Sequence, residues 1–111
     1  MSAAKRGRDV PGEFGEAVNM SPAQLRGWLQ TPESKSVGMH RGGGESVGHE
    51  SGRRILTLLR TRRDKLSERD VAHMRKVVGY VHRHLAQRPH GDVTRTRWRY
   101  SLRNWGHDPL K

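Results

Sequence analysis

Four arginines near the carboxyl end of the chain alternate with aromatic side chains. The residues concerned are Arg95, Arg97, Trp98, Arg99, Tyr100, Arg103 and Trp105. A guanidinium group binds phosphate through two parallel hydrogen bonds, and an aromatic ring can stack on a nucleobase. The pattern therefore predicts contact with a polyanion, although a tryptophan belongs to the hydrophobic core more often than to a base-stacking surface.

A second cationic surface is predicted on a long helix over residues 68–88. Apolar residues recur there at spacings of three and four and form one stripe, which comprises Val71, Met74, Val78, Val81 and Leu85. At 100° per residue the opposite side carries three cations and no carboxylate. The residues on that side are Arg69, His73, Lys76, Tyr80, Arg83 and Gln87. Surface helices usually mix charge signs, so this side is interpreted as shaped to lie along phosphates, with an ordinary solvated face as the alternative.

The positive charge is confined to the second half of the chain. Residues 1–50 hold six Lys or Arg against six Asp or Glu, whereas residues 51–111 hold sixteen against five and carry the whole net charge of +11. Arg53, Arg54 and Arg60 lie at the start of this basic half. A basic surface on ordered helices is typical of nucleic-acid-binding proteins, and solubility alone would not need so uneven a distribution.

Helix starts are marked by capping residues that precede apolar patterns. Ser21 is followed by Pro22 and Gln24, Ser67 by Asp70, and Thr94 is a weaker third cap. These signals predict helices over 22–31, 68–88 and 95–105, which end at Pro32, Pro89 and Gly106.

Two further segments are predicted to be helical, and one segment is ambiguous. The spacing of Ile55, Leu58, Leu59 and Arg62 predicts a helix over about 51–63, and a short first helix is expected around Phe14. Residues 95–105 would also fit a strand in which arginines alternate with aromatic residues. The cap and Gly106 favour the helix.

The expected fold is all-α, a compact bundle of four to five helices. Residues 1–10 are predicted to be a disordered basic arm, and residues 11–111 a single domain with a long Gly/Ser-rich loop over 33–50. The chain has no cysteine and no apolar stretch of membrane-spanning length. These features indicate a soluble cytoplasmic protein, associated with the nucleoid if it binds DNA.

Several strings in the sequence carry a family resemblance. They include SKSVG (34–38), GESVGHESGRRI (44–55), AHMRKVV (72–78), RHLAQ (83–87) and NWGHDP (104–109). With these strings, nearly the whole chain from Phe14 onward resembles a small family of unknown function found in bacteria and fungi. Members of that family are commonly labelled DNA-binding proteins. The resemblance thus implies DNA binding but assigns no functional residue.

One of these strings also suggests an anion site. Residues 48–54 are predicted to run into a helix N-terminus, where free amides and the helix dipole favour an anion, and Arg53 and Arg54 would add charge. The alternative is that Ser51 simply caps the helix. The Gly-Lys-Ser/Thr order of a nucleotide-binding P-loop is missing, which argues against an NTPase.

Catalysis and metal binding find little support in the sequence. His82 and His84 point in nearly opposite directions on a helix, and four suitable zinc ligands are not recognisable. The acidic residues of a metal-dependent nuclease are scarce where the positive charge lies. We therefore expect neither an enzyme nor a cofactor.

The function expected from the sequence is binding of double-stranded DNA, mainly through phosphates, by a small chromosome-associated or architectural protein. Six to eight phosphate contacts would make log affinity fall against log salt with a slope of roughly −5 to −7. RNA or ribosome binding, and docking on an acidic protein partner, are the alternatives; a homodimer through the 71–85 stripe stays open. The residues expected to contact DNA are Arg53, Arg54, Arg60, Arg69, Lys76, Arg83, Arg95, Arg97, Arg99 and Arg103.

Overall fold

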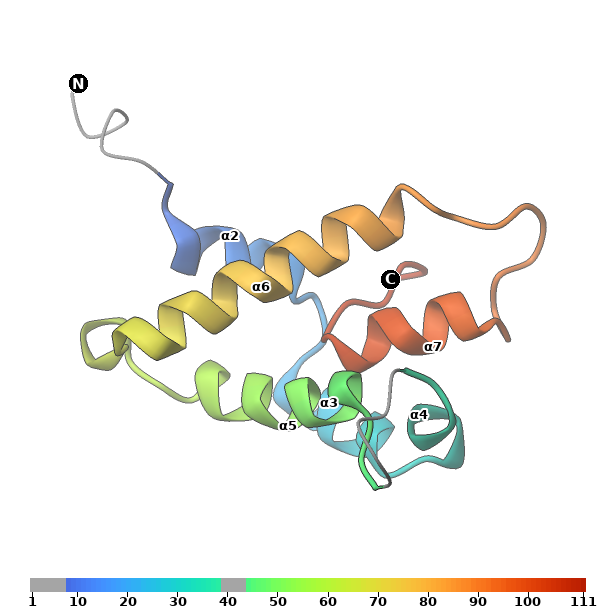
Figure 1. Cartoon of the computed structure of the whole chain (residues 1–111), viewed down its shortest axis with the longest axis horizontal. Helices are drawn as coiled ribbons and strands as arrows, with labels where there is room; N and C mark the ends of the chain where they lie inside the picture. The colour runs from blue at the N-terminus through green and yellow to red at the C-terminus, as the bar shows by residue number, and fades with distance from the viewer. Residues whose placement is uncertain (1–7, 39–43) are drawn as a thin grey trace.

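The computed structural model describes residues 8–38 and 44–111, which form six α-helices and one 3₁₀ turn, with no strand among the residues described. In Figure 1 the long helix α6 crosses one side of the molecule and α5 runs on the other side. Helix α7 lies beside the C-terminal half of α6 and the N-terminal half of α5. The all-α class is confirmed, with six α-helices in place of the four or five expected.

The first helix begins earlier than expected. Helix α2 (Val10–Ala17) is capped by Asp9, whose side chain accepts a hydrogen bond from the Gly12 amide, and proline lies in its first turn. Val10 is 4% exposed, so the arm predicted over 1–10 cannot extend to this residue. The remainder of that prediction, residues 1–7, lies outside the residues described.

Helix α3 (Pro22–Leu29) begins as predicted, with a capping box between Ser21 and Gln24. The next helix, α4 (Pro32–Ser36), was expected to be loop. Pro32 was interpreted as a helix end, but Thr31 caps a new helix in which Pro32 holds the first position. The long loop predicted over 33–50 is therefore wrong at both ends, and residues 39–43 of it lie outside the described part of the chain. A five-residue helix is too short to produce a recognisable apolar period.

Helix α5 (Val47–Leu59) begins four residues before the predicted start and ends earlier than the predicted Arg63. Its cap is Ser46, whose hydroxyl accepts from the His49 amide at 3.1 Å. Ser51 is thus an interior residue of the helix and not its cap. The anion site predicted at a helix N-terminus over 48–54 is also wrong, because Arg53 and Arg54 lie about two turns into the helix.

A 3₁₀ turn (Arg63–Lys65) connects α5 to α6 (Glu68–Leu85). The predicted capping box of α6 is present, with reciprocal bonds between Ser67 and Asp70. The helix ends three residues before the predicted Arg88. The apolar stripe is confirmed and also includes Val77, which is 0% exposed and lies between Met74 and Val81 on the same face.

Helix α7 (Arg97–Asn104) resolves the ambiguity of residues 95–105 in favour of a helix, with Thr96 as its cap instead of Thr94. As predicted, Gly106 stops the helix: it lies two residues after Asn104 and has a φ of 83°. Its amide donates to the Arg103 carbonyl and the His107 amide donates to the Leu102 carbonyl, which is the bonding pattern of a Schellman motif. This left-handed turn sends the carboxyl-terminal residues back along α7.

The core forms where α2 packs on α6, and where α3, α4 and α5 pack around α7. Gly52 permits the closest approach, because a Cβ atom there would lie 2.6 Å from the Asn104 carbonyl oxygen and 2.7 Å from Leu29. A side chain at this position would push α5 away from α3 and α7. Within the described residues, no helix has the length and apolar character needed to cross a membrane.

Candidate nucleic-acid interface

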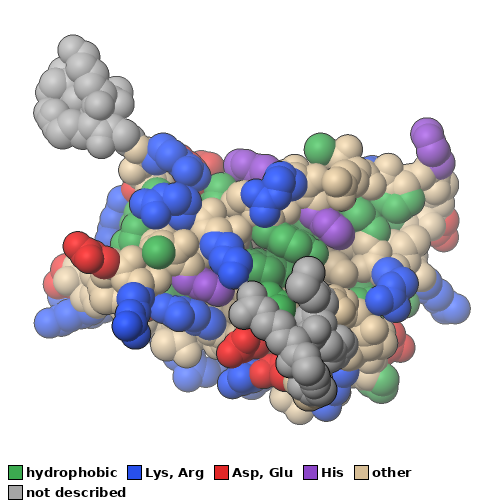
Figure 2. Space-filling model, viewed as in Figure 1, with side chains coloured by type: hydrophobic (Ala, Val, Ile, Leu, Met, Phe, Trp, Pro, Cys, Tyr) green, Lys and Arg blue, Asp and Glu red, His purple; other side chains and the backbone are tan. Residues whose placement is uncertain are grey.

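Three of the predicted cations form an exposed line along α6. Arg69, Lys76 and Arg83 repeat every seven residues, and all three side chains are exposed. None of them has an acidic partner within the residues described. Figure 2 shows Lys and Arg side chains gathered over α5 and α6 on this face, next to a hydrophobic patch. This line is the part of the predicted surface in which the cations are free to meet an external anion.

A groove lies between α5 and α6. We define it as two adjoining cavities, a wide cavity of about 400 Å³ and a narrow cavity of about 270 Å³. Both are lined by Val47, Lys76 and Trp105. Arg53 and Arg54 reach the wide cavity from α5, and Arg83 reaches the narrow cavity from α6. The groove therefore brings together four of the ten predicted residues, Arg53, Arg54, Lys76 and Arg83.

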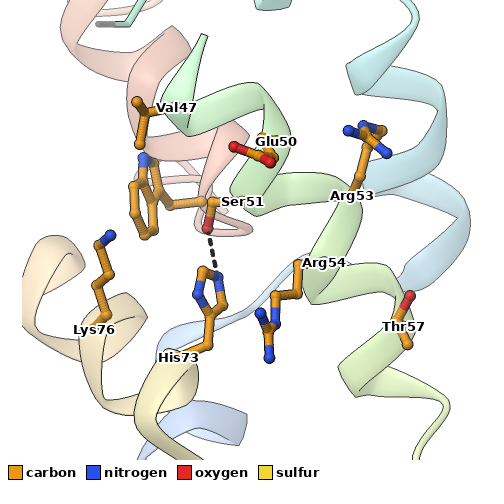
Figure 3. A pocket seen from close by; sticks show the side chains of 9 residues that line it. Val47, Glu50, Ser51, Arg53, Arg54, Thr57, His73 and Lys76 are labelled. Atoms are coloured by element: carbon orange, nitrogen blue, oxygen red, sulfur yellow. Dashed lines mark hydrogen bonds between the residues drawn. The ribbon is translucent and has the colours of Figure 1, made fainter. Parts of the chain in front are cut away.

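A direct bond joins the two helices at the wide cavity. The Ser51 hydroxyl and His73 Nε2 are 3.0 Å apart, and Figure 3 shows them meeting between the helices, with Arg54 and Lys76 on either side of His73. Burial, together with the charges of Arg54 and Lys76, lowers the pKa of His73 to about 4. His73 is therefore neutral at pH 7, and the positive charge in the wide cavity comes from the arginines and the lysine.

The two arginines of α5 differ in how firmly they are held. Arg53 makes a two-pronged ion pair with Glu45, at 2.6 and 2.7 Å. Hydrogen bonding to Arg53, against the opposing effect of burial, lowers the pKa of Glu45 to about 2. Arg54 meets Asp70 through a single contact of 3.4 Å; its side chain is 43% exposed and that of Arg53 is 58% exposed. Arg54 is therefore the more weakly paired of the two, and its guanidinium group can be released more easily to an external phosphate.

The predicted contact with a polyanion requires the carboxyl-terminal guanidinium groups to project into solvent, and those of Arg99 and Arg103 do not. Arg99 forms a two-pronged pair with Asp108 at 2.9 and 3.1 Å, and its side chain is 16% exposed. The guanidinium of Arg103 lies 4.0 Å from the ring centre of Trp28. The turn at Gly106 causes this, since it carries Asp108 back to the arginines. Although burial opposes the effect, hydrogen bonding to Arg99 keeps the pKa of Asp108 below its usual value.

The three remaining predicted residues lie outside the groove. Arg60 follows the last residue of α5, Arg95 precedes α7, and Arg97 is the first residue of α7. All three are exposed. They add positive charge to the surface without lining either cavity.

A ladder of five aromatic rings connects α6 to α7 and was not predicted. The rings follow the order His73, Trp105, Tyr80, His84 and Trp98, with centroids 4.3–6.2 Å apart and interplanar angles of 12–17°. His73 and Tyr80 are seven residues apart on α6, and Trp98 of α7 is seven residues from Trp105, which directly follows that helix. The two equal intervals of seven residues are the feature of the sequence from which this ladder could have been predicted. The face of α6 opposite its apolar stripe is therefore partly covered by aromatic rings, so the alternative of an ordinary solvated face does not hold for His73 and Tyr80.

Among the residues that the structure describes, no group of three or more His, Asp or Glu side chains could hold a metal ion. The candidate site consists mainly of cations, hydroxyl groups and aromatic rings, with Glu50 as a carboxylate in the wall of the wide cavity, a set that suits an anion better than a cation.

A family model described as Protein of unknown function (DUF3140) matches residues 13–103. The match covers most of the chain, so the resemblance to a family of unknown function is confirmed. The DNA-binding label that the resemblance implied stays a prediction. No curated protein and no solved structure gives a significant match.

Proposed function

This chain belongs to the DUF3140 family of unknown function, and we propose that it binds double-stranded DNA, mainly through phosphate contacts, as a small chromosome-associated or architectural protein. The observation that carries the proposal is the line of Arg69, Lys76 and Arg83 on α6, exposed and without acidic partners in the described residues. A net charge of +11 would add long-range attraction to any polyanion.

The dimensions of this line suit a nucleic-acid backbone. From Arg69 to Arg83 a helix rises about 21 Å, which is more than half of one turn of a duplex. Arg54 lies across the groove from Lys76 and adds a fourth cation on the same side. Contacts of this kind hold a duplex in position without reading its bases, so little sequence preference is expected.

The number of available cations lowers the expected salt dependence. Arg99 and Arg103 are occupied within the protein, and Arg53 is held by a two-pronged pair with Glu45. This leaves Arg69, Lys76 and Arg83 on this side, together with Arg54, whose single contact with Asp70 is longer. Four phosphate contacts correspond to a slope of log affinity against log salt of roughly −3 to −4. This value replaces the steeper slope expected from sequence alone.

Charge reversal on α6 tests the proposal. In the double variant Lys76→Glu Arg83→Glu, we expect weaker binding to duplexes of unrelated sequence alike, and a salt slope that is shallower by about 2. Fluorescence anisotropy at several salt concentrations measures both quantities. The matched control is Arg26→Glu Lys35→Glu, which reverses two exposed cations on α3 and α4 and changes net charge equally.

Equal losses in the two double variants would mean that only net charge matters and would overturn the assignment to α6. Unchanged affinity in the α6 variant would have the same consequence. Competition between duplex DNA and a structured RNA of equal length decides between the proposal and RNA binding. An RNA-binding protein would prefer the RNA competitor, whose helix has the A form.

A further inference from the structure

The two cavities of the groove differ in chemistry. The wide cavity is polar and basic, with Ser51, Arg54, His73 and Lys76 in its walls. The narrow cavity is mainly apolar, lined by Val47, Tyr80 and Trp105, with Lys76 and Arg83 beside them. We propose that the groove is a site for one unpaired nucleotide, with its phosphate in the wide cavity and its base in the narrow cavity. This inference rests on the proposed function, because it assumes that the same cations meet DNA.

The wide cavity has the groups that a phosphate needs. Arg54 and Lys76 approach from opposite helices, and both are close enough to His73 to lower its pKa. Figure 3 shows Arg54 and Lys76 on the two sides of the Ser51–His73 bond, whereas Arg53, which also lines the cavity, is paired with Glu45. The carboxylates nearby are Glu50, which also lines the cavity, and Asp70, which is 3.4 Å from Arg54.

The narrow cavity has apolar walls and two polar groups suited to a base edge. Trp105 is 4% exposed, and its indole N–H has no acceptor among the described residues. A Cβ atom at Gly48 would lie 3.0 Å from this nitrogen, so the absence of a side chain at Gly48 leaves the N–H uncovered. Ser101 lines the same cavity, and its hydroxyl is hydrogen-bonded to Tyr80, another residue of the lining. A donor without an acceptor at the wall of a cavity favours a ligand that brings a matching acceptor.

The orientation of the base follows from the aromatic ladder. Both faces of Trp105 are already occupied, by Tyr80 at 4.3 Å and by His73 at 6.2 Å between ring centroids. A base in the narrow cavity would therefore meet the edge of Trp105 and would not stack on its face. Only a base that is out of the double helix could enter, because a paired base is stacked within the duplex.

A fluorescent base analogue provides the test. We compare a fully paired duplex with the same duplex carrying one bulged 2-aminopurine, and expect the bulged duplex to bind on the order of tenfold more tightly. The emission of 2-aminopurine should change on binding as the base leaves water. The variant Ser101→Leu fills the narrow cavity without changing any charge, so it should remove the preference and retain affinity for the paired duplex. Gly48→Ala, which covers the indole N–H, should reduce the preference.

The nucleotide in the groove could belong to a DNA strand or be a soluble mononucleotide, and titration with free nucleotides distinguishes these two sources. Deoxynucleoside 5′-monophosphates are titrated by calorimetry, with inorganic phosphate as the control that lacks a base. Binding of the monophosphates that Ser101→Leu abolishes, without preference for the bulged duplex, would support the site with a soluble nucleotide as its occupant. Circular dichroism and thermal melting check that each variant is folded.

The outcomes distinguish the inference from the function on which it rests. Equal affinity for bulged and paired duplexes, with no binding of monophosphates, would overturn the nucleotide site while leaving DNA binding intact. A preference for the bulged duplex that persists in Ser101→Leu would also overturn it. Failure to bind any duplex would instead overturn the proposed function.

Discussion

Asn104 holds three segments together through one side chain. It is 1% exposed, and its amide oxygen accepts from Trp28 Nε1 at 2.7 Å and from the Ser34 hydroxyl at 2.5 Å. Its amide nitrogen donates to the Ser34 carbonyl at 3.0 Å. Satisfied buried networks specify one arrangement of their partners, and here they fix α3 and α4 against α7. Asn104 also lines the narrow cavity, so this network helps to fix one wall of the groove.

His73 makes stability depend on pH. Its pKa of about 4 in the folded chain lies below the ordinary value of 6.5, so the unfolded chain binds more protons between these values. The free energy of unfolding should therefore decrease as pH falls from about 6.5 to 4. We expect His73→Gln to lose this part of the decrease, as measured by urea unfolding at a series of pH values.

The matched control for this prediction is His82→Gln, which removes an exposed histidine from the same helix. An NMR titration of the native protein should give a midpoint near 4 for His73. A midpoint near 6.5, or equal pH profiles for the two variants, would contradict the prediction.

At the scale of elements, the position of α5 depends on the absence of a side chain at Gly52. The variant Gly52→Ala should destabilise the fold by about 1–3 kcal/mol, because its Cβ would meet backbone oxygen of α7 and the side chain of Leu29. Urea unfolding measures the change. Since α5 forms one wall of the groove, duplex affinity should fall as well.

Gly27 provides the control within helix α3. A Cβ atom there has nothing within 4 Å, so Gly27→Ala should stabilise the protein by about 0.5–1 kcal/mol through helix propensity alone. Equal effects of the two substitutions would show that the close approach of helices at Gly52 does not contribute to the free energy of unfolding.

At the scale of the molecule, the apolar stripe of α6 is buried in the core of its own chain. The buried side chains of α6 join those of α2 and α7 in one core, and Leu110, at 46%, is the only large hydrophobic residue exposed in the described residues. Little apolar surface is left there for a second copy. We therefore expect a monomer of 12.7 kDa in light scattering after gel filtration. A mass twice this value at micromolar concentration would contradict the expectation.

Local signals in the sequence determined the helical class, the caps at Ser21 and Ser67, the stripe of α6 and the end of α7 at Gly106. Each of these depends on residues within a few positions of one another, so they can be recognised without a fold. The same holds for the line of Arg69, Lys76 and Arg83, which follows from the helical period.

Only the tertiary structure decided which cations are free. Asp108 reaches Arg99 because a left-handed turn reverses the chain, and Arg103 packs on Trp28 from a helix more than seventy residues away in sequence. The groove likewise needs α5, α6 and α7 together, since Ser51 lies in α5, His73 in α6, and Trp105 directly after α7. Contacts between distant segments depend on how the helices pack, and the spacing of residues along one helix does not predict that packing.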